Sequence, residues 1–108
     1  NNSRVFPALG LSIDLRQFIL RSDTGRIELT STEFRIVEFL SRRPGWIYSR
    51  YEIVDVARGS DCVVTERTVD VHIAAIRRKL GNSAFVIETV RGVGYRFIES
   101  YPESNMAA

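Results

Sequence analysis

The chain has 108 residues, with 15 basic and 13 acidic side chains and a net charge of +2. This length supports one domain with a single hydrophobic core. The single cysteine excludes a disulfide framework and a cysteine-based metal cluster, and it favours a reducing compartment. The sequence has no apolar run near 18 residues and no secretory leader, so we expect no membrane span in this fragment and a cytoplasmic location. The start at Asn1, without Met, predicts that the chain is part of a longer protein.

The basic charge is concentrated in the second half of the chain. Residues 41–98 contain ten basic side chains against six acidic ones. All the basic residues of the chain except Lys79 are arginine, whose planar guanidinium suits phosphate groups and guanine edges. A nucleic acid is therefore a candidate partner, although the net charge alone is too small to indicate one.

The first third of the chain is strand-like. Residues 4–29 alternate apolar and polar side chains between turn residues, which predicts an antiparallel sheet of three or four strands. The expected strands include Leu11–Asp14, Phe18–Leu20 and Arg26–Leu29. We place the folded domain at 11–98, after a linker or disordered start at 1–10 and before a flexible tail at 99–108.

Two helices follow, and each begins with a capping box. Thr30 with Glu33, and Ser49 with Glu52, have the spacing at which the side chain of each residue bonds the backbone amide of the other. The first helix ends before Pro44-Gly45, and the second ends near Gly59. The short segment 46–48 between them is predicted to join a sheet edge.

The segment 65–80 is predicted to form a helix, and this helix says more about function than any other element of the chain. Val69, Ile73, Ile76 and Leu80 form a narrow apolar stripe that faces a core. The opposite side combines small side chains with Arg67 and Arg78, so it is slim enough for a nucleic-acid groove and has the right charge for phosphate. An ordinary amphipathic helix with a solvated basic face would show the same pattern.

The last elements predicted are two strands, Phe85–Val90 and Tyr95–Ile98, joined by Arg91-Gly92-Val93-Gly94. The two glycines allow the positive φ that tight hairpins need, and Arg91 then lies at or near the tip. Such a tip could enter a minor groove, where the negative potential is concentrated. A solvated tip is the alternative interpretation.

The sequence offers no catalytic constellation and no cofactor site. It has one histidine, no spacing typical of metal ligands, and no phosphate-binding glycine loop before a helix. Glu33 and Glu52 are explained by the capping boxes. We therefore expect neither an enzyme nor a metal or cofactor.

Four blocks together resemble the C-terminal winged-helix DNA-binding domain of the OmpR/PhoB family of two-component response regulators. The similarity extends from about Leu11 to Phe97. The blocks are Leu29-Thr30-x-x-Glu33-Phe34, Ser49-Arg50, Arg67-Thr68-Val69-Asp70-Val71-His72-Ile73-x-x-Ile76-Arg77-x-Lys79-Leu80 and Thr89-Val90-Arg91-Gly92-Val93-Gly94-Tyr95.

The resemblance implies an α+β fold, a winged helix-turn-helix with an N-terminal antiparallel sheet, three helices and a C-terminal β-hairpin wing. It also implies sequence-specific binding of double-stranded promoter DNA, with the helix at 65–80 in the major groove and the wing at 86–98 in the minor groove. A phosphorylated receiver domain would control this output. Carried over by position, the residues near DNA are Arg67, Thr68, Asp70, Val71, His72, Ala74, Ala75, Arg78, Thr89 and Arg91.

The resemblance further implies a contact with RNA polymerase through the loop at 59–64 and a dimer on tandem half-sites. The chain departs from the family pattern at Ala74 and Ala75, where relatives often have longer polar side chains. It also lacks the aromatic residue common at the end of the second helix, whose space we expect Trp46 or Tyr51 to fill. The alternative function is a winged-helix protein-interaction module that does not bind DNA.

Overall fold

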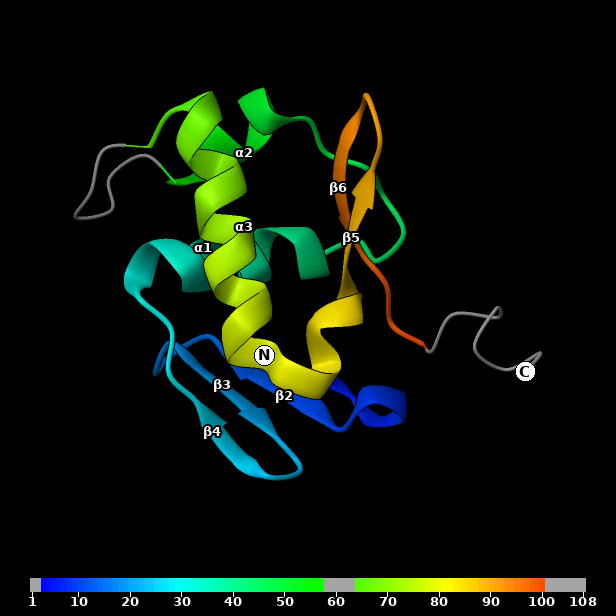
Figure 1. The fold of residues 1–108 in the computed structure, drawn as a ribbon. Helices are drawn as coiled ribbons and strands as arrows, with labels where there is room; N and C mark the ends of the chain where they lie inside the picture. Colours follow the sequence, from blue (N-terminus) through cyan, green and yellow to red (C-terminus); the bar gives the residue numbers. More distant parts are fainter. Residues whose placement is uncertain (1–2, 58–63, 101–108) are drawn as a thin grey trace.

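The computed structural model describes residues 3–57 and 64–100. Its elements follow the predicted order of a sheet, three helices and a hairpin (Figure 1). The α+β winged helix-turn-helix fold predicted from the sequence is confirmed. The strands are β1 (Ser3–Phe6), β2 (Leu11–Asp14), β3 (Ile19–Ser22), β4 (Gly25–Ile27), β5 (Ile87–Val90) and β6 (Gly94–Phe97), and the α-helices are α1 (Ser31–Ser41), α2 (Arg50–Ala57) and α3 (Glu66–Leu80).

The N-terminal sheet is antiparallel, with strand order β1-β2-β3-β4. Figure 1 shows it at one end of the molecule, with α2 at the other end and the β5–β6 hairpin beside α3. Alternation along the strands turns Leu11, Ile13 and Leu20 to the helices, where all three are buried. The sheet therefore covers the core from the side opposite the hairpin tip.

The folded domain begins earlier in the sequence than the predicted start at Leu11. Within the expected linker at 1–10, residues Ser3–Phe6 form β1 and Pro7–Leu9 form a 3-10 turn. Phe6 is buried, with its ring centroid 4.9 Å from that of Phe97 in β6. The prediction of a linker was wrong for these residues because the partner of Phe6 lies about ninety positions along the chain.

Both predicted capping boxes are confirmed. The Thr30 amide donates to Glu33 Oε1 over 3.0 Å, and the Glu33 amide donates to Thr30 Oγ1 over 3.2 Å. At α2 the Ser49 amide donates to Glu52 Oε1 over 2.8 Å, and the Glu52 amide donates to Ser49 Oγ over 3.2 Å. Local side-chain bonds thus fix where both helices begin.

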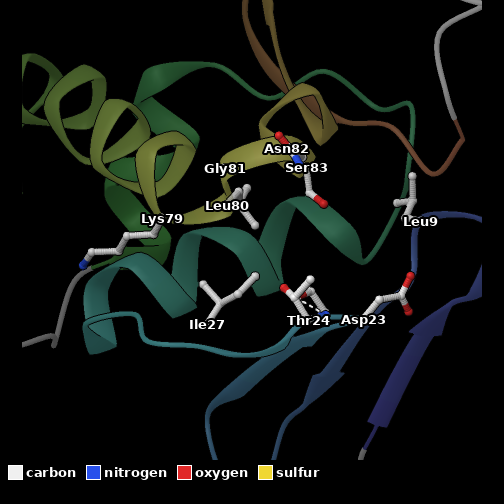
Figure 2. A pocket seen from close by; sticks show the side chains of 10 residues that line it. Leu9, Asp23, Thr24, Ile27, Lys79, Leu80, Gly81, Asn82 and Ser83 are labelled. Carbon is white, nitrogen blue, oxygen red and sulfur yellow. Dashed lines mark hydrogen bonds between the residues drawn. The ribbon is translucent and has the colours of Figure 1, made fainter.

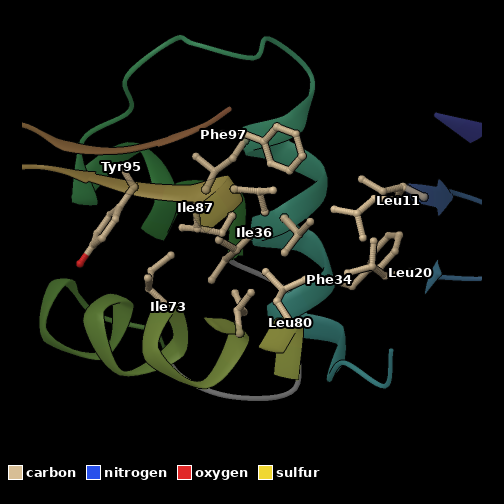
Figure 3. Close-up of a cluster of buried hydrophobic side chains, with 14 of the residues drawn as sticks. Leu11, Leu20, Phe34, Ile36, Ile73, Leu80, Ile87, Tyr95 and Phe97 are labelled. Atoms are coloured by element: carbon tan, nitrogen blue, oxygen red, sulfur yellow. The ribbon is translucent and has the colours of Figure 1, made fainter. Parts of the chain in front are cut away.

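One cluster of buried hydrophobic side chains joins all these elements. Figure 3 shows Phe34 and Ile36 of α1, Ile73 and Leu80 of α3, and Phe97 of β6 meeting in it. The predicted apolar stripe of α3 is confirmed, because Val69, Ile73, Ile76 and Leu80 are all buried. This packing fixes which face of α3 turns outward.

The hairpin differs from the prediction at its first strand. Residues 81–86 form a 3-10 segment, so β5 begins at Ile87 rather than at Phe85. Val86 is buried in the core, and its carbonyl still accepts a hydrogen bond from the Ile98 amide over 2.9 Å, next to the paired strands.

The segment before α2 pairs with the hairpin, as predicted for 46–48. The Tyr48 amide donates to the Tyr95 carbonyl over 2.8 Å, and the Tyr95 amide donates to the Tyr48 carbonyl over 2.9 Å. A Cβ on Gly94 would lie 1.9 Å from the Tyr48 oxygen. Glycine is therefore required at position 94 for this close approach, whereas only Gly92 has the positive φ that we expected, at 78°.

Candidate nucleic-acid interface

The face of α3 opposite the core is open to solvent. Arg67, Ala74 and Arg78 are exposed, and Val71 keeps 65% of its surface accessible. Neither arginine bonds another side chain among residues 3–57 and 64–100. Two free cations therefore flank a surface of small side chains, which suits entry into a groove lined by phosphates.

The tip of the hairpin supplies a third free cation. Arg91, Gly92 and Val93 are all exposed. The Val93 amide donates to the Val90 carbonyl over 2.9 Å and closes the turn, and Gly92 has the positive φ. In the described part of the chain Arg91 has no ion-pair or hydrogen-bond partner.

The other residues predicted near DNA lie around these two surfaces. Asp70 and Thr89 are exposed, and Thr68, His72 and Ala75 are partly buried. Burial raises the pKa of Glu33, but the hydrogen bonds from Lys79 and Thr30 lower it below its ordinary value, and nearby His72 adds the smallest contribution in the same direction. The predicted residues therefore lie on several sides of α3 and of the wing, and they do not all face solvent to the same extent.

Thr68 is held by the start of its own helix. Its hydroxyl accepts from the Thr65 amide over 2.7 Å and donates to the Thr65 carbonyl over 2.9 Å. The Thr68 amide in turn donates to Thr65 Oγ1 over 3.3 Å. This arrangement is a capping box with threonine in place of the usual glutamate, and the resemblance gave no sign of it.

Asp70 connects three elements. Its Oδ1 accepts a hydrogen bond from Arg50 Nε at the start of α2 over 2.9 Å, and a short one from the Tyr95 hydroxyl of β6. The hydrogen bond from Arg50 and then the one from Tyr95 lower the pKa of Asp70. For Tyr95, burial and then the bond to Asp70 raise the pKa.

Arg77 makes a second connection between α3 and the hairpin. Its Nε and Nη2 donate to the Ile87 carbonyl over 3.1 and 2.7 Å, and Nη2 also donates to Thr89 Oγ1 over 2.7 Å. The hydroxyl of Thr89, a residue predicted near DNA, is thus held by this arginine. Arg50, Arg77 and Tyr95 bond to the predicted residues Asp70 and Thr89 but were not predicted as site residues themselves. A signal in the sequence was the spacing of Asp70 and Arg77, which places them two helical turns apart on one side of α3.

Trp46 and Tyr51 do not fill the space at the end of α2. Trp46 is 58% exposed and Tyr51 is 70% exposed, so the expectation that one of them packs there was wrong. The Arg43 guanidinium instead lies over the Trp46 ring, with the Arg43 Cζ atom 4.9 Å from the ring centroid. Ala57 at the end of α2 is itself fully buried.

A polar cavity of about 360 Å³ lies elsewhere, between the β3–β4 turn and the end of α3. Figure 2 shows Asp23 and Thr24 on one side of it and Asn82 and Ser83 on the other. None of the residues predicted near DNA lines it. Over the described ranges, no three His, Cys, Asp or Glu side chains are grouped to hold a metal ion, and no helix is long and apolar enough to cross a bilayer.

The chain matches known proteins over most of its length. The profile of the family described as "Transcriptional regulatory protein, C terminal" matches residues 24–97. The phosphate regulon transcriptional regulatory protein PhoB of Rhizobium meliloti is 48% identical over 71 residues, which cover 64% of this chain and 31% of that protein. PhoB of Escherichia coli K12 is 37% identical over 95 residues, which cover 86% of this chain and 42% of that protein. The chain thus spans less than half the length of these relatives.

Solved structures agree in fold. The DNA-binding domain of the response regulator AdeR, in complex with an intercistronic region, has a TM-score of 0.72 and 32% identity, over 83% of this chain and 95% of that one. The Klebsiella pneumoniae RstA DNA-binding domain, in complex with the RstA box, has a TM-score of 0.76 and 26% identity, over 92% and 99%. The chain belongs to the family of transcriptional regulatory protein C-terminal domains, and within it to the OmpR/PhoB type that its sequence resembles.

Proposed function

We propose that the chain binds double-stranded DNA sequence-specifically, as the output domain of a transcriptional regulator of a two-component system. The observation that carries this proposal is the exposed cationic face of α3 beside a hairpin tip that bears Arg91. Two projecting elements with unpartnered arginines can contact adjacent grooves of one duplex. The AdeR and RstA domains, solved with bound DNA, support this assignment.

In the proposed complex, the helix at 65–80 enters the major groove and the wing at 86–98 contacts the minor groove. Arg67 and Arg78 bind phosphates or base edges, and Val71 contacts a thymine methyl group. The small side chain of Ala74 allows α3 to approach the DNA closely, while His72 and Ala75 lie beside the DNA backbone. Arg91 enters the minor groove, where a narrow width strengthens its attraction. Thr68, Asp70 and Thr89 lie within the footprint, with their side chains engaged by the protein.

The remaining partners are proposals that rest on the family. We assign to the chain a cytoplasmic location, control by a receiver domain, dimerisation on tandem half-sites, and contact with RNA polymerase through the loop at 59–64. Residues 59–63 of that loop lie outside the described part of the chain. A protein-interaction module without DNA binding is not favoured, because the related domains AdeR and RstA were solved on DNA.

Fluorescence anisotropy tests this function. The probe is a duplex that the wild-type chain selects from a random-sequence library. We expect Arg78→Ala and Arg91→Ala each to weaken binding by roughly 1–3 kcal/mol. With several phosphates contacted, affinity should fall by about 10³-fold between 50 and 200 mM salt.

Arg21→Ala is the matched control, because Arg21 is exposed on β3 and has no partner among the described residues. This substitution should leave affinity within a factor of two. Failure to select any duplex, or equal losses in all three variants, would contradict the proposed function.

A further inference from the structure

The wing is attached to α3 at two points that lie along one side of the helix. The Asp70 carboxylate accepts a hydrogen bond from the Tyr95 hydroxyl of β6, and the Arg77 guanidinium donates to the Ile87 carbonyl of β5. Seven residues of α-helix separate the two points by about 10 Å. Attachment at two separated points fixes both the position and the tilt of the hairpin.

These attachment residues occupy a face of α3 that is distinct from its other two. At about 100° per residue, Asp70 and Arg77 point in nearly the same direction. This direction lies between the buried stripe of Val69, Ile73 and Ile76 and the exposed face of Arg67, Val71 and Arg78. The helix therefore has a core face, a wing face and an outer face.

Tyr95 is held from two sides. Its backbone pairs with Tyr48, and the residue as a whole is only 5% exposed. Figure 3 shows its side chain above α3, with the hydroxyl pointing away from the buried cluster. The Arg77 guanidinium lies over the same ring, 5.8 Å from its centroid. A shift of the wing relative to α3 would have to break both the bond to Asp70 and the contact with Arg77.

Asp70 is poorly placed to read a base. A carboxylate at a DNA surface is repelled by phosphates unless a cation compensates it, and Arg50 Nε supplies that cation over 2.9 Å. Both bonds fall on Oδ1, so Arg50 and Tyr95 together hold the carboxylate group in one orientation against the protein's own side chains.

We propose that Asp70 and Tyr95 are positioning residues for DNA binding: their bond sets the wing at a fixed distance and angle from α3, so that Arg91 and α3 meet one duplex together. The proposal rests on the proposed function. It reassigns Asp70 from DNA contact to wing support.

A double-mutant cycle tests this coupling. Tyr95→Phe removes only the hydroxyl, and Tyr48→Phe is the control, because the Tyr48 hydroxyl has no hydrogen bond within the described residues. Each is combined with Arg91→Ala and measured on the duplex selected by the wild-type chain. We expect Arg91→Ala to cost roughly tenfold in the wild-type and Tyr48→Phe backgrounds, and less than about threefold in Tyr95→Phe. Equal costs in every background would overturn the proposal, while leaving the proposed function intact.

A base-preference measurement separates support from readout. We expect Asp70→Asn and Tyr95→Phe to lower affinity without changing the preferred base at any position of the selected site. A change of preference at one base pair in Asp70→Asn would overturn the proposal, because it would make Asp70 a reader. If Arg91→Ala did not lower the affinity of the otherwise wild-type chain for DNA, this would instead contradict the wing contact of the proposed function.

Backbone amide order parameters give a readout that needs no DNA. In Tyr95→Phe, those of Val90, Arg91 and Val93 should fall, while those of α1 stay unchanged. Unchanged order parameters at the wing tip would overturn the proposal, since the hydroxyl would then not restrain it. A thermal unfolding scan of each variant confirms that the chain remains folded at the temperature of measurement.

Discussion

Lys79 Nζ lies 2.6 Å from Glu33 Oε1, so the last turn of α3 is bonded to the first turn of α1. The Glu33 carboxylate is almost completely buried, and it also caps α1 by accepting from the Thr30 amide. One carboxylate therefore fixes both the start of α1 and the end of the helix that carries the outer arginines.

We expect Lys79→Met to destabilise the fold by about 1–2 kcal/mol. The substitution leaves Glu33 buried with the Thr30 amide as its remaining hydrogen-bond donor among the described residues, although partial exposure of Lys79 limits the loss. Urea unfolding at pH 7 measures it, with Lys79→Arg as the variant that keeps the charge. A change below about 0.3 kcal/mol would mean that the ion pair has no net effect on stability.

Stability should fall on acidification, and Glu33 should account for part of this. Burial raises the pKa of Glu33, but hydrogen bonds from Lys79 and the Thr30 amide outweigh it and leave the pKa below its ordinary value of 4.5. As the pH falls, the Glu33 carboxylate takes up a proton at a higher pH in the unfolded chain than in the folded one. The stabilisation is therefore present above about pH 4.5 and is lost as the pH falls through the pKa of the folded state. Urea midpoints between pH 7 and 3 should fall less steeply in Glu33→Gln than in the wild type. Glu99→Gln, at an exposed position, controls for loss of a carboxylate.

The two glycines of the hairpin should respond differently to alanine. Gly94→Ala places a Cβ 1.9 Å from the Tyr48 carbonyl oxygen, and relief requires separation of two paired backbones. We expect a loss of about 3 kcal/mol. Gly92→Ala meets no atom within 4 Å, but its φ of 78° is unfavourable for alanine and should cost about 1–2 kcal/mol. Thermal unfolding compares them, and equal losses would refute the separate roles of the two glycines.

Thr68 should affect stability more than DNA binding. Thr68→Val removes the hydroxyl that bonds both the amide and the carbonyl of Thr65, so we expect a loss of about 1 kcal/mol in unfolding free energy. Under conditions where the variant is folded, its affinity for the selected duplex should stay within threefold of the wild type. A tenfold loss of affinity without a loss of stability would make Thr68 a direct contact.

Local signals were the ones that sequence could supply. Thr30 with Glu33, and Ser49 with Glu52, bond across three residues, so their spacing alone predicts the caps. The stripe from Val69 to Leu80 follows the helical period, which also predicts that Arg67 and Arg78 turn outward. The position of Arg91 follows from the turn residues around it.

Contacts between distant segments were the ones that sequence could not supply. β1 is ordered by contacts such as that of Phe6 with Phe97, and the close approach at Gly94 depends on Tyr48. Asp70 has the appearance of an outer-face residue on a helical wheel, and only the placement of Arg50 and Tyr95 reveals that it supports the wing. Pairings across 20 or more residues leave no periodic trace in the sequence.

Amide chemical-shift mapping on the selected duplex tests the central claim most directly. If α3 and the wing bind one duplex together, the largest shifts should fall at residues 67–78 and 89–93, and those of β1 to β4 should be small. Largest shifts at Arg21 and Arg26 on the sheet, with α3 unchanged, would contradict the account.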